Sequence, residues 1–211
     1  MNEFFYKVNE KEYLVVVEKK RIKNIYYRFD NGVFKVSCGH GVLKSQIIKG
    51  LDKYASKMIK RSERPNPKTD DYFYLFGVKV DLEESGEISF TNDRKIIYKS
   101  RDDLDKKLHK MFLEILKERV AYYSNVMNLP LYKVSLKNMK TRFGSNSSYT
   151  KTLHFSYMLI HFSYEIIDSV IVHELAHILV HDHSKKFYDV VYKYCPNYKT
   201  YRKKLIRGEY Q

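Results

Sequence analysis

Apolar and polar positions alternate along the first forty residues and then change to a helical spacing. Runs rich in Val and Tyr predict strands, and a turn-forming Asn31-Gly32 pair between two of them predicts a hairpin. The strands are expected at 12–18, 25–30 and 33–38. Apolar residues then recur every three or four positions over 43–61, which predicts an amphipathic helix with a basic outer face.

The next stretch contains a break followed by more strand-like pattern. Pro65-Asn66-Pro67 interrupts regular structure, and further strands are expected at 72–82 and 95–99, separated by a turn at 83–87. We predict an α+β class, with a β-rich N-terminal subdomain of residues 1–100 that contains one helix.

The second half of the chain is predicted to be mainly helical. A long helix is expected from Asp102, a plausible cap, to a stop at Pro130. A second helix, from Ser163 to about Leu179, is apolar on nearly all sides, which is typical of a buried helix. Short strands at 133–137 and 152–156 around a turn region at 144–148, and helices at 185–194 and 197–206, complete the predicted domain of residues 101–211.

Composition restricts the class of protein only moderately. Lys and Arg outnumber Asp and Glu by 39 to 25, giving a formal charge of +14 that would attract polyanions or acidic substrates. Because the basic residues are scattered along the chain, a Lys-rich solvated surface explains them better than nucleic-acid binding does. The two cysteines, Cys38 and Cys195, form no C-x-x-C pair. No long apolar run or signal-peptide pattern occurs, so we expect a cytoplasmic protein without membrane contact.

The strongest chemical signal lies inside the predicted buried helix, where the sequence reads His173-Glu174-Leu175-Ala176-His177. Residues four apart share a helix face with about 6 Å between Cβ atoms, so both imidazoles can reach one zinc ion at about 2.1 Å. Glu174 lies about 100° around the helix, where it can take a proton from a water at the metal. Core histidines satisfied by hydrogen bonds, with Glu174 in an ion pair, are the structural alternative, but unpaired burial of these groups would be costly.

A catalytic zinc site needs a third protein ligand and one open position. His181 would lie about 12 Å along the axis from His173 if the helix continued, which is too far, and we interpret it as an exposed loop residue. His183 is the better candidate if the helix ends near Leu179 and the chain folds back. Its spacing from His177 equals that of metzincins, but Val180 stands where that motif has Gly.

Several segments together resemble the YgjP-like metallopeptidase family. They are Thr141 to Ser145, Leu153-His154-Phe155, Ile167 to His177, and Asp182-His183-Ser184 with Phe187, followed by Cys195-Pro196-Asn197-Tyr198. The resemblance covers residues 102–206. The family pattern has Trp, Cys, Asn and Asn at positions 143, 146, 154 and 182, where this sequence has Phe143, Asn146, His154 and Asp182.

This resemblance implies a zincin-like fold related to the SprT and Wss-type proteases, with zinc held by His173, His177 and His183 and with Glu174 as the base. It also implies that the 142–155 segment forms a strand beside the cleft, where an extended peptide could add main-chain hydrogen bonds. Arg142, Phe143 and Gly144 are therefore candidates for substrate binding, although a core hairpin explains the segment equally well. His154 and His161 are expected to be structural.

The combined prediction is a zinc-dependent peptidase that acts on a peptide or protein. Four residues are candidates for stabilising the oxyanion, namely Tyr188, Tyr201, Arg142 and His154. Two alternatives remain open, a metal-dependent hydrolase of nucleotides or phosphoesters and a DNA-associated zinc protein without catalysis. A peptidase recruited to DNA would combine features of both.

Overall fold

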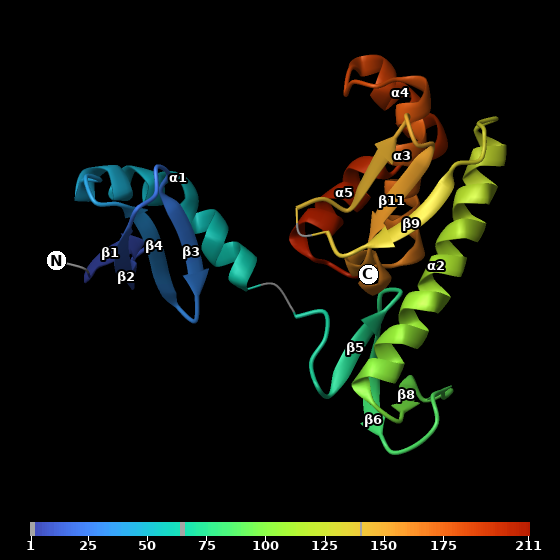
Figure 1. The fold of residues 1–211 in the computed structure, drawn as a ribbon, viewed down its shortest axis with the longest axis horizontal. Coiled ribbons are helices and arrows are strands. Elements are labelled where there is room, and N and C mark those ends of the chain that lie inside the picture. Colours follow the sequence, from blue (N-terminus) through green and yellow to red (C-terminus); the bar gives the residue numbers. More distant parts are fainter. Residues whose placement is uncertain (1–2, 64–65, 140) are drawn as a thin grey trace. The chain divides into compact units, whose positions relative to one another are not determined.

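The computed structural model describes residues 3–63, 66–139 and 141–211. The chain divides into two compact units, Met1–Arg64 and Pro65–Gln211. Both combine helices with strands (Figure 1), so the α+β class predicted from the sequence is confirmed. The units divide at Pro65, next to the predicted Pro-Asn-Pro break, rather than at the boundary expected near residue 100.

The first unit is a four-stranded sheet with one helix packed on it. The strands pair in the order β1-β2-β4-β3, with β2 and β4 parallel. Asn31 and Gly32 both have positive φ, +48° and +77°, as the predicted hairpin turn requires. The elements are β1 (Glu3–Val8), β2 (Lys11–Lys20), β3 (Tyr26–Asp30), β4 (Val33–Gly39) and α1 (Lys44–Ser62). Alternate strand residues such as Val15 and Phe34 form the core with Ile47, Leu51 and Ala55 of α1.

The second unit begins with a small sheet that the sequence assigned to the N-terminal subdomain. Its strands are β5 (Tyr72–Leu75), β6 (Val78–Glu84), β7 (Ser89–Phe90) and β8 (Lys95–Tyr98). The predicted strand 72–82 is divided by a turn in which Phe76 and Gly77 have positive φ. The amide of Phe76 donates to the Ile160 carbonyl at 2.9 Å, and Phe73 and Ile96 join the core that contains Phe112. Residues 66–100 therefore belong with the C-terminal part of the chain.

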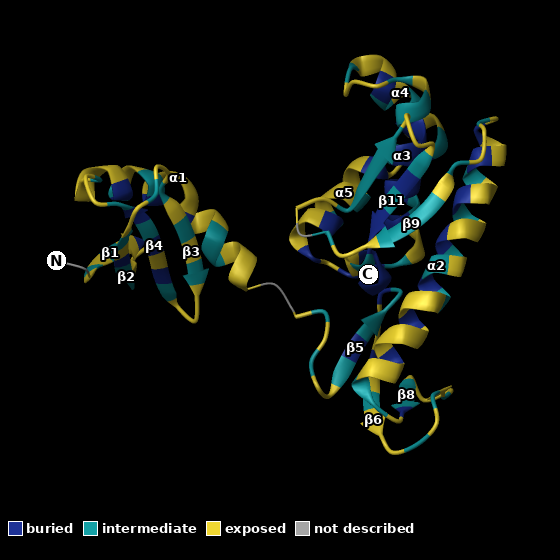
Figure 2. Ribbon diagram, viewed as in Figure 1, coloured by how far each residue is buried: buried dark blue, intermediate teal, exposed yellow. Residues whose placement is uncertain are grey.

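The remaining elements surround a buried helix, α3 (Tyr164–Leu179). They are α2 (Arg101–Val126), β9 (Lys133–Lys137), β10 (Gly144–Ser147), β11 (Thr152–Ser156), the 3-10 helix η1 (Tyr157–His161), α4 (Lys185–Tyr194) and α5 (Tyr198–Arg207). The strands form a sheet in the order β10-β11-β9, with β10 at an edge. Figure 2 shows α3 as mostly buried, as its apolar pattern predicted.

Two local predictions for this unit need correction. Residues 144–147 form strand β10 and not a turn, because they pair with β11 and the chain reverses only at 148–151. The N-cap of helix α2 lies two residues earlier than predicted, because Ser100, and not Asp102, is the cap: its hydroxyl accepts the Asp103 amide at 3.3 Å. No helix in the described part of the chain is long and apolar enough to cross a membrane.

Candidate metal centre and active-site cleft

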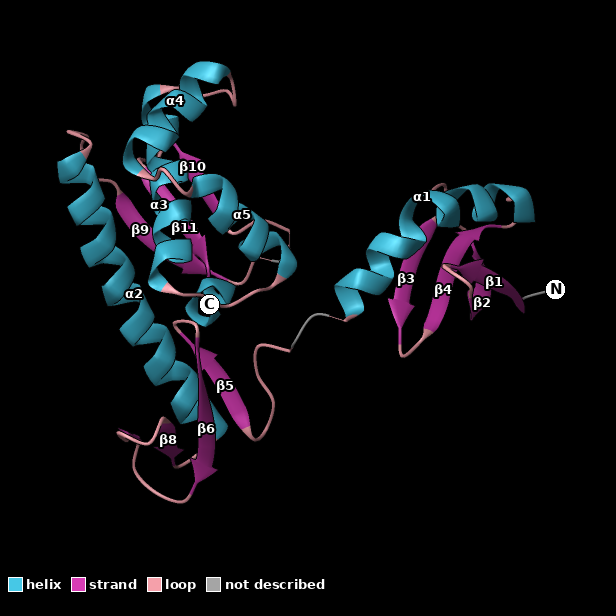
Figure 3. Ribbon diagram, turned by 180° about the vertical axis from the view of Figure 1, so that it is seen from behind, coloured by secondary structure: helices cyan, strands magenta, loops and turns pink. Residues whose placement is uncertain are grey.

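Three imidazoles converge where α3 ends and the chain turns towards α4 (Figure 3 shows these helices from behind). His173 and His177 project from one face of α3, as their four-residue spacing requires. The helix ends at Leu179 and Val180 is extended, so the chain folds back as the sequence predicted. One nitrogen from each of His173, His177 and His183 lies within 4.8 Å of the others. The exposed His181 is not in this group.

Partners on Nδ1 hold the two helical imidazoles in place. The Nδ1 of His173 is 2.8 Å from the Tyr198 hydroxyl, and that of His177 is 3.2 Å from the Val180 carbonyl oxygen. Because a carbonyl only accepts, the His177 proton is on Nδ1. A proton on Nδ1 of His173 can likewise be donated to the Tyr198 oxygen. Such outer partners fix the tautomer of a metal-binding histidine and its ring orientation.

A buried phenylalanine supports all three rings from behind. Phe187 of α4 is 0% exposed, and its ring centroid lies 4.9, 4.5 and 4.9 Å from those of His173, His177 and His183. Burial, followed by the charges of the neighbouring histidines, lowers the pKa of His173 to about 3. This imidazole is thus neutral at physiological pH, which is the form that binds metals.

These residues fit a divalent ion such as zinc. The Nε2 atoms of His173 and His183 are 3.2 Å apart, close to the spacing of about 3.4 Å for two nitrogens bound tetrahedrally to one zinc ion. Imidazole is a common ligand of this metal. Within the described residues the group contains three donors, the number found in catalytic zinc sites.

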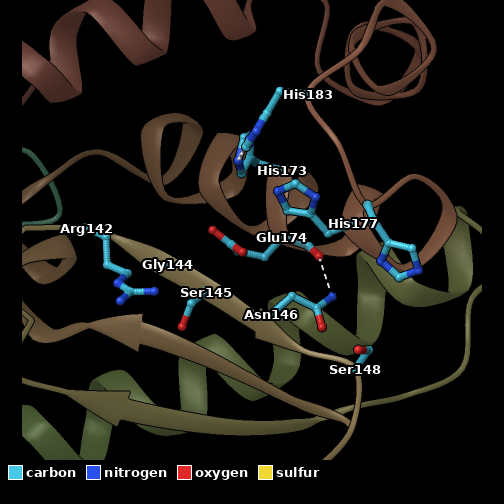
Figure 4. A pocket seen from close by; sticks show the side chains of 10 residues that line it. Arg142, Gly144, Ser145, Asn146, Ser148, His173, Glu174, His177 and His183 are labelled. Atoms are coloured by element: carbon cyan, nitrogen blue, oxygen red, sulfur yellow. Dashed lines mark hydrogen bonds between the residues drawn. The ribbon is translucent and has the colours of Figure 1, made fainter.

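Glu174 lies beside the triad with its carboxylate directed towards β10 (Figure 4). The side chain is buried, with 5% exposure. Burial raises its pKa to about 7, while the positive charge of Arg142 acts in the opposite direction. This carboxyl group is the only titratable one in the described part of α3 that is fully buried.

The absence of a side chain at Gly144 makes room for that carboxylate. A Cβ atom built on Gly144 would lie 2.5 Å from Oε1 of Glu174 and 2.7 Å from its Cγ. Two positions along the same strand, the Asn146 side-chain amide donates to the Glu174 carbonyl oxygen at 2.8 Å. Strand β10 therefore touches both the side chain and the backbone of Glu174.

Two adjoining hollows form a cleft at the triad. One, of about 320 Å³, extends past His177, His181 and β10. The other, of about 310 Å³, extends past Tyr198 and Arg202 and has an apolar part. Both are lined by Arg142, Gly144, His173, Glu174 and His183, so the cleft reaches to either side of Glu174.

The other residues singled out in the sequence are divided between the cleft and the core. Phe143 lines the second hollow and packs edge-on against Phe162 at 5.8 Å. Of the four oxyanion candidates, Arg142 lines the cleft, whereas Tyr188, Tyr201 and His154 are not among the residues lining either hollow. His161 is 2% exposed, and its Nδ1 is 2.8 Å from the Tyr74 carbonyl oxygen, in agreement with a structural role.

The pair Tyr198 and Arg202 was not predicted to act at the site. Tyr198 is 4% exposed, and its hydroxyl accepts from Nη1 of Arg202 at 3.2 Å while contacting His173. Their four-residue spacing on α5 indicates a shared face. The sequence alone cannot show that this face meets α3.

Three imidazoles around one point, with a buried carboxyl group beside them in an open cleft, define a metal-dependent hydrolase. A sequence model described as YgjP-like, metallopeptidase domain, matches residues 23–207. The chain belongs to the YgjP-like family and is a metallopeptidase, with a peptide or protein as its substrate. The family resemblance noted in the sequence is thereby confirmed.

Two solved structures are similar to part of the chain. The metallopeptidase zymogen of Pyrococcus abyssi abylysin is 18% identical over 44% of this chain and 93% of its own, with a TM-score of 0.42. The zymogen of Methanocaldococcus jannaschii jannalysin is 25% identical over 44% of this chain and 95% of its own, with a TM-score of 0.41. Among curated proteins, none matches the chain significantly.

Proposed function

We propose that the protein is a zinc peptidase in which His173, His177 and His183 hold the ion and Glu174 is the general base. The observation that carries this proposal is the convergence of three imidazole nitrogens within 4.8 Å beside a buried carboxyl group. When bound, zinc would polarise the scissile carbonyl and acidify a water molecule. The donor set consists only of imidazoles, which suits zinc better than magnesium or calcium.

The proton transfers would belong to Glu174. Its carboxylate takes a proton from the attacking water and returns it to the leaving nitrogen, so that the carboxyl group is unchanged after each turnover. The burial that raises the pKa of Glu174 to about 7 places it in the range where a group can both accept and release a proton.

The substrate would lie along strand β10. This strand is at the edge of its sheet and pairs with β11 through one side only. An extended peptide can add to such an edge by main-chain hydrogen bonds. Arg142 and Phe143 come directly before β10 and line the cleft, where Arg142 can contact the peptide carbonyl and Phe143 an apolar side chain. Gly144 contributes by allowing Glu174 to approach the strand.

Replacing Glu174 by Gln tests the base. The substitution keeps the size of the side chain but removes its ability to accept a proton, so we expect kcat on a casein-derived peptide to fall by about 10²- to 10⁴-fold. Zinc content, measured by mass spectrometry, should be unchanged. Glu165→Gln in the exposed first turn of the same helix is the matched control and should keep full activity.

Three results would refute these assignments. Cleavage by Glu174→Gln at the rate of the unmodified protein would exclude Glu174 as the base. Hydrolysis of nucleoside triphosphates without cleavage of peptides would exclude the proposal that the protein is a peptidase. A zinc content that stays the same in His173→Ala would contradict the proposed ligands.

Gly144→Ala tests the close packing of β10 on Glu174. The added methyl group must displace the carboxylate, because it would lie 2.5 Å from Oε1. A misplacement of about 1 Å can reduce turnover by about 10²-fold, and we expect a loss of this order in kcat with zinc retained. Gly41→Ala, where a Cβ meets no atom within 4 Å, is the control. Equal activity of the two variants would show that the Glu174 position does not depend on Gly144.

A further inference from the structure

The outer face of helix α1, far along the sequence from the catalytic residues, carries a stripe of lysines. Lys49, Lys53, Lys57 and Lys60 are all exposed (yellow on α1 in Figure 2). At 100° per residue they fall within an arc of about 80°, opposite the buried Ile47, Leu51 and Ala55. We call these four residues the lysine stripe. It extends about 17 Å along the helix axis.

Two acidic residues, Asp52 and the C-cap residue Glu63, lie near the lysine stripe, but neither forms an ion pair with it in the part of the chain that the structure describes. No ion pair within the described residues involves a residue of α1. The helix contains six basic residues and one acidic residue, Asp52. Asp52 lies to one side of the stripe, and its carboxylate accepts the Tyr6 hydroxyl at 2.5 Å.

A generally Lys-rich composition does not explain this pattern. Helix α2 of the same protein contains six basic and five acidic residues, and its exposed lysines form ion pairs such as Lys106 with Asp102 and Lys117 with Glu114. The first unit has 15 basic and 7 acidic residues, a net charge of +8, whereas the longer second unit has 24 and 18, a net charge of +6. Positive charge is therefore concentrated in the first unit.

The arrangement is also unfavourable for the helix itself. Like charges three or four residues apart destabilise a helix. The helix dipole can favour Lys60 in the last turn, but it offers nothing to Lys49 or Lys53. A bound polyanion would relieve this repulsion.

We infer that the lysine stripe binds the phosphodiester backbone of a nucleic acid, without sequence preference. Helix residues between and beside the four lysines on this face are polar, such as Gln46 and Ser56. The face therefore has no apolar side chains to insert into a lipid surface, as membrane-bound helices require. Four aligned ammonium groups match a linear array of phosphates, and binding is driven by the release of counterions.

Binding of labelled duplex DNA and single-stranded RNA to the full chain tests this inference. Fluorescence anisotropy over salt concentrations from about 50 to 200 mM should give a slope of log K against log salt of about −3 to −4 for duplex DNA, if four phosphates are contacted. The comparison of duplex and single strand tells which form of the backbone is preferred. The variant K49Q/K53Q/K57Q/K60Q should bind at least 10-fold more weakly at the midpoint of this range, with a slope near zero.

A variant of equal net charge provides the control. K106Q/K107Q/K110Q/K117Q removes four exposed lysines from α2 and should bind within about two-fold of the unmodified protein. Circular dichroism checks the fold of both variants. If the quadruple α1 variant does not fold, K49Q/K53Q should reduce the slope by about 2, while K49R/K53R should keep it.

Three results would overturn the inference. They are equal loss of binding in the α1 and α2 variants, absence of salt-dependent binding to either nucleic acid, and stripe-dependent binding to phosphatidylserine vesicles without binding to nucleic acid. None of these measurements depends on peptidase activity, so the proposed function and this inference can fail separately.

Discussion

At the scale of single residues, the site depends on partners that orient the functional groups. His173 and His177 each have Nδ1 in contact with an oxygen, from Tyr198 and Val180 respectively. Nε2 of His173 faces the third imidazole, 3.2 Å from Nε2 of His183. Tyr198 is itself contacted by Arg202, so a chain of three side chains extends from the cleft into α5.

Tyr198→Phe should weaken zinc binding. The substitution removes the oxygen that contacts Nδ1 of His173 but keeps the ring, and loss of such an outer partner typically reduces metal affinity by about 10- to 100-fold. Competition with a chromogenic chelator measures the Kd. Tyr192→Phe on α4, an exposed tyrosine, is the control. An unchanged Kd in Tyr198→Phe would mean that the hydroxyl does not position the ligand.

At the scale of elements, polar contacts join α3 and η1 to their neighbours. Asp168 of α3 accepts from the Arg119 guanidinium through both oxygens and from the Tyr123 hydroxyl at 2.9 Å, and both partners lie on α2. In η1, which directly precedes α3, His161 contacts the Tyr74 carbonyl of β5. These contacts hold the helix that carries the site against the rest of the second unit.

Asp168→Asn should destabilise the second unit. Arg119 would lose its carboxylate partner while still partly buried, with a side-chain exposure of 32%. Removing one member of a buried pair costs about 3–5 kcal/mol, and partial exposure reduces this to about 1–3 kcal/mol. Urea unfolding measures the change. Glu114→Gln changes an exposed ion pair on α2, the helix that carries Arg119, and should have no measurable effect on stability. A similar loss of stability in both variants would contradict the role of Asp168.

His161 should make stability depend on pH. Burial is the main cause that lowers its pKa to about 4, below the value of about 6.5 expected in the unfolded chain. Since the unfolded state binds the proton more tightly, the free energy of unfolding is highest above pH 6.5 and falls as the pH decreases towards 4. The contribution of His161 to this fall is about 3 kcal/mol.

Urea titrations of the metal-free protein at several pH values measure this dependence. The side chain of His161→Asn has a hydrogen-bond donor but does not titrate. Between pH 6.5 and 4, the free energy of unfolding of this variant should therefore decrease by about 3 kcal/mol less than that of the unmodified protein. Parallel curves for the two proteins would show that His161 is not the group responsible.

At the scale of the whole molecule, two separate cores indicate two units that unfold separately. Leu51 belongs to the core of the first unit, and the three histidines proposed as metal ligands lie in the second. We expect zinc to raise the Tm of the second unit only, because a ligand stabilises the unit that binds it. Leu51→Ala should destabilise the first unit by about 2–5 kcal/mol.

Differential scanning calorimetry with and without zinc tests both expectations. Leu116→Ala, which makes the same truncation in the core of the second unit, should instead lower the Tm of the zinc-dependent transition. A single transition that responds equally to zinc, Leu51→Ala and Leu116→Ala would show that the chain unfolds as one unit.

Features that depend on local geometry could be predicted from the order of residues alone. Helical periodicity is enough to put His173 and His177 on one face, and the Asn31-Gly32 turn is specified by its own backbone preferences. The end of α3 near Leu179 and the buried character of that helix also followed from the order of residues. The choice of His183 as the third ligand followed from that helix end, and the family resemblance agreed with it.

Features that depend on contacts between distant segments became visible only in the tertiary structure. The approach of Gly144 to Glu174 joins two elements thirty residues apart, and the contact of Tyr198 with His173 joins α5 to α3. The sheet formed by residues 72–98 was assigned to the wrong half of the chain because local pattern does not reveal which core Phe73 and Ile96 enter. Periodicity specifies the face of an element, but only packing specifies what that face meets.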